Sequence, residues 1–141
     1  MFIGKYYYTL ESKGRVSLPK VFRTHQKNWV ITRGLDGAIF LFPETIYQLE
    51  VEKLSQLSSH KRIVRDAVRL LSNDAVNLTP DKLGRISIPD YLIATAGLSK
   101  NLVIVGSLSK VEIWDRDKYH TYMETLVVAA ETTVEQLPGQ V

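Results

Sequence analysis

An internal repeat constrains this chain more than any other feature of its sequence. Residues 11–19 read Glu-Ser-Lys-Gly-Arg-Val-Ser-Leu-Pro, and 70 positions later residues 81–89 read Asp-Lys-Leu-Gly-Arg-Ile-Ser-Ile-Pro. The similarity continues in the apolar segments 29–31 and 102–104. The chain of 141 residues therefore consists of two related units of about 70 residues each. Because a unit of that size has a small core, we expect the two units to pack as one body.

The two units have the same predicted order of short elements. The repeated serine between apolar residues gives an alternation of period two, which is typical of a half-buried strand. Pro19 and Pro89 end these strands, because proline cannot donate to a strand ladder. The predicted elements of the two units, in order, are strands 6–10 and 75–78, strands 15–18 and 85–88, helices 20–25 and 90–96, strands 29–32 and 102–105, and strands 38–42 and 111–114.

Longer helices are predicted at three places. One runs from about Pro43 to Leu57, a second from about Ser59 to Leu71 with Ser58 or Ser59 as its N-cap, and a third from the N-cap Asp115 to about residue 130. The tail 131–141 is expected to be frayed. Apolar faces at helical spacing comprise Ile63, Val64, Ala67, Val68 and Leu71 in the second helix, and Tyr119, Tyr122, Met123, Leu126, Val127 and Ala130 in the third.

Charge is distributed unevenly along the chain. Residues 1–74 hold 12 basic and seven acidic side chains, whereas residues 75–141 hold six basic and eight acidic ones. The first 35 residues carry seven basic side chains and a single acidic one, Glu11. A basic front half is the footprint expected of a polyanion-binding protein, although a solvated surface would explain the same charges.

Several function classes find no support in the sequence. There is no cysteine, which excludes disulfides, thiolate metal sites and a cysteine nucleophile. The three histidines lack metal-ligand spacing, no Walker-type loop is present, and Ser17 and Ser87 have no nearby histidine. The apolar runs are too short to span a membrane, and no signal peptide is recognisable. We therefore predict a cytoplasmic protein that is not an enzyme, with no catalytic residues, metal, cofactor, small-molecule substrate or membrane partner.

The repeated segment itself predicts a hairpin loop. An acidic residue and an arginine lie four positions apart around the turn, so they can pair across the ladder, with the arginine offering two donors to the carboxylate. The glycine between them suits the positive φ that tight hairpin loops require. The residues assigned to this structural motif are Glu11, Gly14 and Pro19 in the first unit and Asp81, Gly84, Arg85 and Pro89 in the second.

The two loops differ in ways that a shared structure does not require. Three basic side chains of the first unit are replaced by apolar or acidic ones in the second. We therefore expect the first loop to face the ligand and the second to serve the architecture. The replaced pairs are Lys13 and Leu83, Lys20 and Asp90, and Arg23 and Ile93, whereas Ser12 against Lys82 is a change in the other direction.

Together these segments resemble the MraZ family, and the resemblance covers nearly the whole chain. It is carried by residues 1–4, 10–19, 22–23, 81–89, 102–106 and 112–115. The family consists of bacterial transcription regulators with two SpoVT-AbrB units, each bearing an Asp-Xaa-Xaa-Xaa-Arg signature. That signature maps its arginines onto Arg15 and Arg85 and its loop lysine onto Lys13. Glu11 departs from the pattern, since the family usually has aspartate there.

The resemblance implies an α+β fold in which two interlocked swapped-hairpin units form one barrel-like body with flanking helices. It implies units at 5–47 and 76–119, followed by a C-terminal helix and tail at 120–141. It also implies a ring-shaped homo-oligomer that binds repeats in double-stranded promoter DNA, at the nucleoid. The genes controlled would be the division and cell-wall cluster, including the protein's own gene.

On this hypothesis Arg15 reads a guanine edge in the major groove, because arginine to guanine is the commonest specific contact there. The remaining predicted DNA contacts position the loop through phosphates, and they are Lys13, Lys20, Arg23 and Lys5. An arginine stripe in the second long helix touches DNA, faces another subunit or is simply solvated, and it comprises Arg62, Arg65 and Arg69. The alternative function is an oligomeric protein-interaction or antitoxin-like module.

Overall fold

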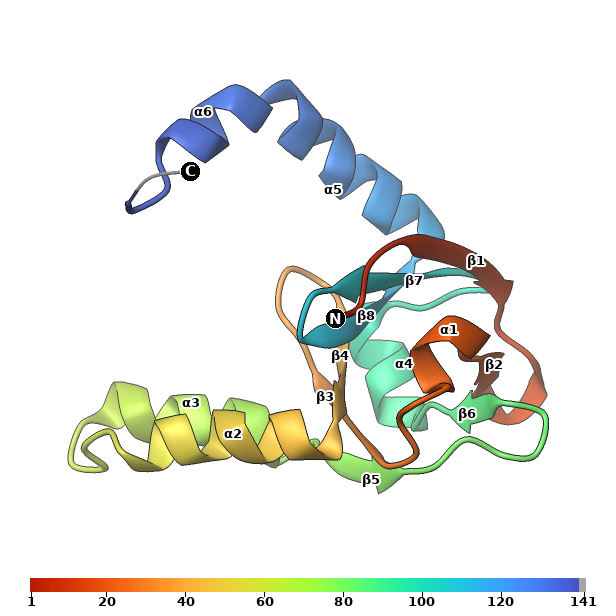
Figure 1. Cartoon of the computed structure of the whole chain (residues 1–141), viewed down its shortest axis with the longest axis horizontal. Coiled ribbons are helices and arrows are strands. Elements are labelled where there is room, and N and C mark those ends of the chain that lie inside the picture. Colours follow the sequence, from red (N-terminus) through yellow and green to blue (C-terminus); the bar gives the residue numbers. More distant parts are fainter. Residues whose placement is uncertain (140–141) are drawn as a thin grey trace.

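A computed structural model describes residues 1–139 of the chain, which fold into an α+β arrangement of antiparallel strands and short helices (Figure 1). Six strands form one sheet in the order β1-β7-β8-β4-β3-β5, and two more, β2 and β6, form a separate ladder. The strands are β1 (Lys5–Thr9), β2 (Arg15–Ser17), β3 (Trp29–Arg33), β4 (Ile39–Pro43), β5 (Val76–Leu78), β6 (Arg85–Ser87), β7 (Asn101–Ser107) and β8 (Lys110–Asp115). The helices are η1 (Ser12–Gly14), α1 (Lys20–Arg23), α2 (Glu44–Ser55), α3 (Arg62–Ser72), α4 (Asp90–Ala96), α5 (Arg116–Val128) and α6 (Ala130–Glu135).

Short strands are exchanged between the two repeats. Strand β1 of the first repeat pairs antiparallel with β7 of the second, and β5 of the second pairs antiparallel with β3 of the first. The ladder of β2 and β6 also joins the two repeats, with Val16 opposite Ile86. Each repeat therefore depends on the other for backbone hydrogen bonds, which agrees with the expectation that the two pack as one body. The six-stranded sheet is open, with β1 and β5 at its edges.

The main hydrophobic core lies between the large sheet and a layer made of β2, β6, α1 and α4 (Figure 1). Both repeats contribute matching side chains, because alternate residues of β2 and β6 point into this core as the period of two predicts. A smaller apolar cluster on the sheet packs against Tyr119 and Tyr122 of α5. Fully buried members of the main core include Val16, Leu18, Trp29, Ile31, Ile86, Leu92, Leu102 and Ile104.

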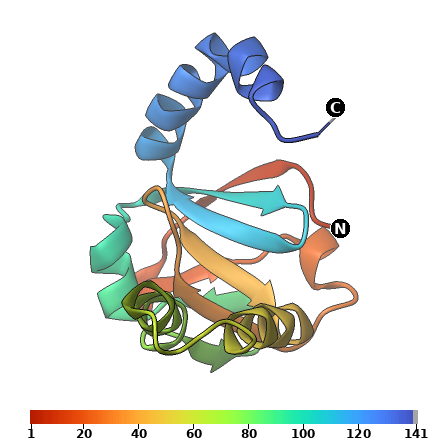
Figure 2. The ribbon, with the colours of Figure 1, turned by 90° about the vertical axis from the view of Figure 1, so that its left-hand side faces the viewer.

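Two helical extensions project from this body. Helices α2 and α3 form a hairpin on one side, and α5 and α6 form an arm on another, as both views show (Figures 1 and 2). Helix α5 begins at the predicted N-cap Asp115, whose carboxylate accepts a hydrogen bond from Lys118 N at 3.3 Å. Within the described residues, no helix combines the length and the apolar composition that crossing a membrane requires.

Three helix predictions need correction. Helix α3 begins at Arg62 rather than near Ser59, because residues 58–61 form a turn in which His60 N donates to Ser58 Oγ. Residues 131–135 of the tail predicted to be frayed belong to α6, while residues 140 and 141 lie outside the described part. The apolar faces predicted for α3 and α5 are only partly buried, since Ile63 is 76% and Val127 69% exposed.

Candidate nucleic-acid interface

The two repeated loops lie at the ends of the ladder formed by β2 and β6 (Figure 1). Leu18 N donates to Gly84 O at 2.9 Å, and Ile88 N donates to Gly14 O at 2.8 Å. Each loop is thus held by the strand of the opposite repeat. Because these bonds tie both loops to a buried ladder, the loops are fixed relative to one another.

Glycine is required in both loops. Gly14 has φ of 70° and Gly84 has φ of 78°, which confirms the predicted left-handed conformation. A Cβ atom on Gly14 would lie 2.7 Å from Ile88 O. Lys13 also has a positive φ, 63°, a conformation that non-glycine residues seldom adopt, whereas its counterpart Leu83 does not. The first loop therefore has a backbone conformation that the second lacks, and its Lys13 is exposed to solvent.

The predicted pairing of acid and arginine is confirmed in the second loop. Asp81 Oδ1 accepts hydrogen bonds from Leu83 N and Arg85 N, both at 2.9 Å, and Oδ2 accepts one from Arg85 Nε at 3.0 Å. These donors, the Arg85 backbone N–H first among them, hold the pKa of Asp81 below its ordinary value of 3.8. The Asp81 carboxylate thus organises its own loop and engages Arg85.

Asp81→Asn should lower the melting temperature above about pH 5 and have less effect in acid. Because the Asp81 pKa is lower in the folded chain, the carboxylate stabilises the fold above its ordinary pKa of 3.8. That contribution is lost as the pH falls through the folded pKa. Melting curves of the variant and the original chain between pH 2.5 and 7 measure the difference.

Glu11→Gln is the matched control for Asp81→Asn, because no side-chain hydrogen bond of Glu11 occurs among residues 1–139. It should change the melting temperature less than Asp81→Asn. A temperature difference for Asp81→Asn that is the same at every pH would contradict the assigned role of the Asp81 carboxylate.

The corresponding pairing in the first loop was predicted and is wrong. Glu11 and Arg15 share a backbone bridge, with Glu11 N donating to Arg15 O at 2.7 Å, but their side chains form no ion pair. Glu11 Oε1 instead lies 3.8 Å from a guanidinium nitrogen of Arg85. Glutamate is one methylene longer than aspartate, so its carboxylate extends beyond its own loop and reaches the arginine of the other repeat.

The two signature arginines therefore differ in their electrostatic surroundings. Arg85 faces the carboxylates of Asp81 and Glu11. For Arg15, no carboxylate lies within 4.0 Å in the part of the chain that the structure describes. Its half-buried side chain retains a positive charge that no neighbouring acid neutralises. An arginine in this state is available to an external anion.

The other predicted contact residues are spread more widely than their order in the sequence suggests. Lys20 is exposed at the first residue of α1, after the buried Pro19. Arg23 donates to Leu18 O at 3.2 Å, and its guanidinium packs against Gly84, so it supports the second loop. Lys5 lies at the far end of β1, roughly 20 Å from the first loop at the rise of an extended strand.

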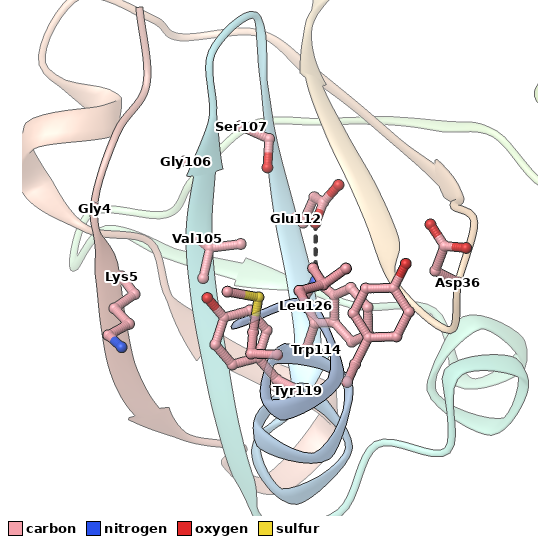
Figure 3. Close-up of a pocket in the computed structure, with 12 residues that line it drawn as sticks. Gly4, Lys5, Asp36, Val105, Gly106, Ser107, Glu112, Trp114, Tyr119 and Leu126 are labelled. Atoms are coloured by element: carbon pink, nitrogen blue, oxygen red, sulfur yellow. Dashed lines mark hydrogen bonds between the residues drawn. The ribbon is translucent and has the colours of Figure 1, made fainter. Parts of the chain in front are cut away.

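Lys5 borders a cavity of about 510 Å³, which lies between α5 and the sheet (Figure 3). The aromatic side chains of Trp114 and Tyr119 extend into it, and Trp114 Nε1 donates to Glu112 Oε1 at 2.9 Å. Trp114 and Tyr119 pack edge to face with centroids 5.6 Å apart, so the cavity follows from how α5 rests on the sheet. Within residues 1–139 no group of three potential ligands could hold a metal ion.

Comparison with known proteins gives a consistent result. A family model described as "MraZ protein, putative antitoxin-like" matches twice, over residues 1–70 and 71–136. A protein named transcriptional regulator MraZ from Pediococcus pentosaceus is 44% identical over 88% of this chain and 87% of its own length. Proteins of the same name from Natranaerobius thermophilus and Carboxydothermus hydrogenoformans are 38% and 35% identical, each over 97% of this chain and 96% of their own length. The double match confirms the tandem repeat.

Proposed function

The chain belongs to the MraZ family, and from that membership we propose that it is a bacterial DNA-binding transcription regulator whose first repeat contacts DNA. The observation that carries the assignment to the first repeat is the contrast between the two signature arginines. Arg85 is engaged by two carboxylates, while Arg15 has no acidic neighbour within 4.0 Å among residues 1–139. Arg15 can therefore bind a base or a phosphate without first breaking an ion pair.

The geometry of the first loop suits DNA. A two-stranded β-ribbon fits the major groove, where an arginine can donate to guanine O6 and N7. Lys13 lies in the turn η1, two residues before Arg15 at the start of β2, and Lys20 follows at the start of α1. These lysines would contact phosphates and fix the orientation of the loop. Arg23 and Lys5 would contribute less, because Arg23 supports Gly84 and Lys5 lies far along β1.

We propose further that the exchanged strands make units 5–47 and 76–119 one interlocked, barrel-like body, with 120–141 as an appendage. Several such bodies would associate as a ring-shaped homo-oligomer. The loops of its subunits would bind repeated sites in promoter DNA at the nucleoid, upstream of the division and cell-wall genes and of the protein's own gene. Linked loops suit this task, since a loop with two or three cations supplies little affinity by itself.

DNA from upstream of the protein's own gene provides the direct test. The protein should bind this fragment more tightly than shuffled DNA of equal length, and binding should weaken steeply as salt rises. A titration over a salt series measures both effects. Equal affinity for the two DNAs would contradict a sequence-specific regulator. Failure to bind either DNA would favour the protein-interaction alternative, which the words "antitoxin-like" in the family description also name.

Lys20→Ala should weaken binding to specific and shuffled DNA by the same factor. A lysine that contacts phosphate carries no sequence information, and each lost phosphate contact lowers the salt slope by about one. Lys27→Ala is the matched control, since Lys27 is another exposed lysine of the first repeat but lies beyond α1. A selective loss on specific DNA would mean that Lys20 reads sequence.

A further inference from the structure

The arm formed by α5 and α6 carries an uncovered apolar surface. Val128 is 90%, Val127 69% and Val134 49% exposed. The half of α5 nearest the sheet packs on β7 and β8, but the apolar pattern continues beyond that contact. Residues 119–137 also hold three glutamates and neither lysine nor arginine. The arm is therefore an acidic helical segment with apolar side chains exposed to water. Helices of this kind commonly bind an apolar groove on a partner protein.

A groove of complementary character lies between α2 and α3. This cavity of about 360 Å³ is lined by the apolar side chains of Leu54, Leu57, Val64 and Val68, together with Arg65 and Arg69. Residues 61–72 hold four basic side chains and one acidic one, Asp66. The lining of the groove thus combines apolar side chains with two arginines and no carboxylate, opposite in charge to the arm.

The arm and the groove are not placed to meet within one chain. In both views the arm of α5 and α6 lies at the top of the molecule and the hairpin of α2 and α3 at the bottom, so the two do not touch (Figures 1 and 2). We propose that the groove between α2 and α3 binds the α5–α6 arm of a second copy of this chain. This inference rests on the proposed homo-oligomer and names its contact surfaces.

The proposed contact is heterologous, because two different surfaces of the chain meet in it. Every copy then presents one arm and one groove, so the contact repeats from copy to copy until the ring closes. The contact also assigns the arginine stripe of α3 to a subunit interface. Arg65 already donates to Ser59 O and His60 O at 2.9 Å, which fixes the turn that ends the groove.

Charge reversal on either surface tests the contact. One variant, Arg62→Glu/Arg69→Glu, changes the net charge of residues 61–72 from +3 to −1. The other, Glu124→Arg/Glu131→Arg, changes the net charge of residues 119–137 from −3 to +1. All four side chains are exposed, so neither variant disturbs the core.

Each variant alone should lose the oligomer in light scattering and approach the mass of one chain, 16.0 kDa. An equimolar mixture of the two should assemble again, because each arm then finds a groove of opposite charge in the other variant. Lys27→Glu/Lys100→Glu is the matched control for Arg62→Glu/Arg69→Glu, since it makes the same change in net charge on exposed residues outside both surfaces. This control should keep the mass of the original oligomer.

A second variant tests the apolar part without altering charge. Val127→Ser/Val128→Ser should weaken association while the melting temperature of the dissociated chain stays the same, because both side chains are mostly exposed. The proposal is overturned if the original chain is a monomer, if either charge variant keeps the original mass, or if folded variants do not assemble when mixed. An original chain that assembles but does not bind DNA would remove the proposed function and leave this contact intact.

Discussion

Arg15→Ala is expected to weaken binding to specific promoter DNA by about 1–3 kcal/mol for each engaged subunit and to reduce discrimination against shuffled DNA. The reason is the state of Arg15 in the folded chain. No carboxylate within residues 1–139 approaches within 4.0 Å of it, so its donors remain available for a guanine edge. Because no ion pair is lost, the melting temperature should change little. Titrations of both DNAs over a salt series, with a melting curve, measure the two effects together.

Arg85→Ala is the matched control for Arg15→Ala. Arg85 occupies the same signature position but engages Asp81 and Glu11. Its loss should lower the melting temperature or impair assembly, while the folded fraction still prefers specific DNA. A stable, assembled Arg85→Ala protein that has lost this preference would reverse the assignment of the two loops. Likewise, a well-folded Arg15→Ala protein with unchanged specificity would show that Arg15 does not read the sequence.

Much of the fold could be predicted from the sequence because the signals are local. Alternation of apolar residues around Ser17 and Ser87 marks β2 and β6, and prolines mark where those strands end. The partners of the strands could not be predicted from those signals. The pairing of β1 with β7 and of β5 with β3 joins residues far apart in sequence, and alternation within a strand carries no information on its neighbour.

The candidate site illustrates the same limit at the scale of side chains. In both repeats the acid and the arginine lie four positions apart, so Glu11 and Asp81 were each expected to pair with the arginine of their own loop. The short Asp81 side chain reaches two backbone N–H groups of its own loop, whereas the longer Glu11 side chain reaches Arg85. Sequence proximity also grouped Arg23 with the first loop, although its guanidinium packs on Gly84 of the second. The exchange of strands brings these residues together.

Chains unable to form the proposed contact between arm and groove should lose most of their affinity for DNA that carries several repeats. When loops are linked in one assembly, each contact after the first becomes effectively intramolecular, which gains about 10²–10⁴-fold in avidity. Glu124→Arg/Glu131→Arg leaves the first loop untouched, because both substitutions lie in α5 and α6. This variant should therefore bind a single repeat as weakly as the original chain binds it, and gain little from added repeats.

Mixing provides the decisive comparison for this prediction. Addition of the Arg62→Glu/Arg69→Glu variant should restore tight binding to the DNA with several repeats, because the two variants then assemble. Titrations of DNA with one repeat and with several, using each variant and the mixture, separate avidity from the intrinsic affinity of a loop. If the dissociated variant binds several repeats as tightly as the original chain does, assembly contributes nothing to DNA affinity. The first loop of a single chain would then have to supply all of that affinity. Lys13, Arg15 and Lys20 offer too few contacts to do so, and further contacts to DNA would be needed.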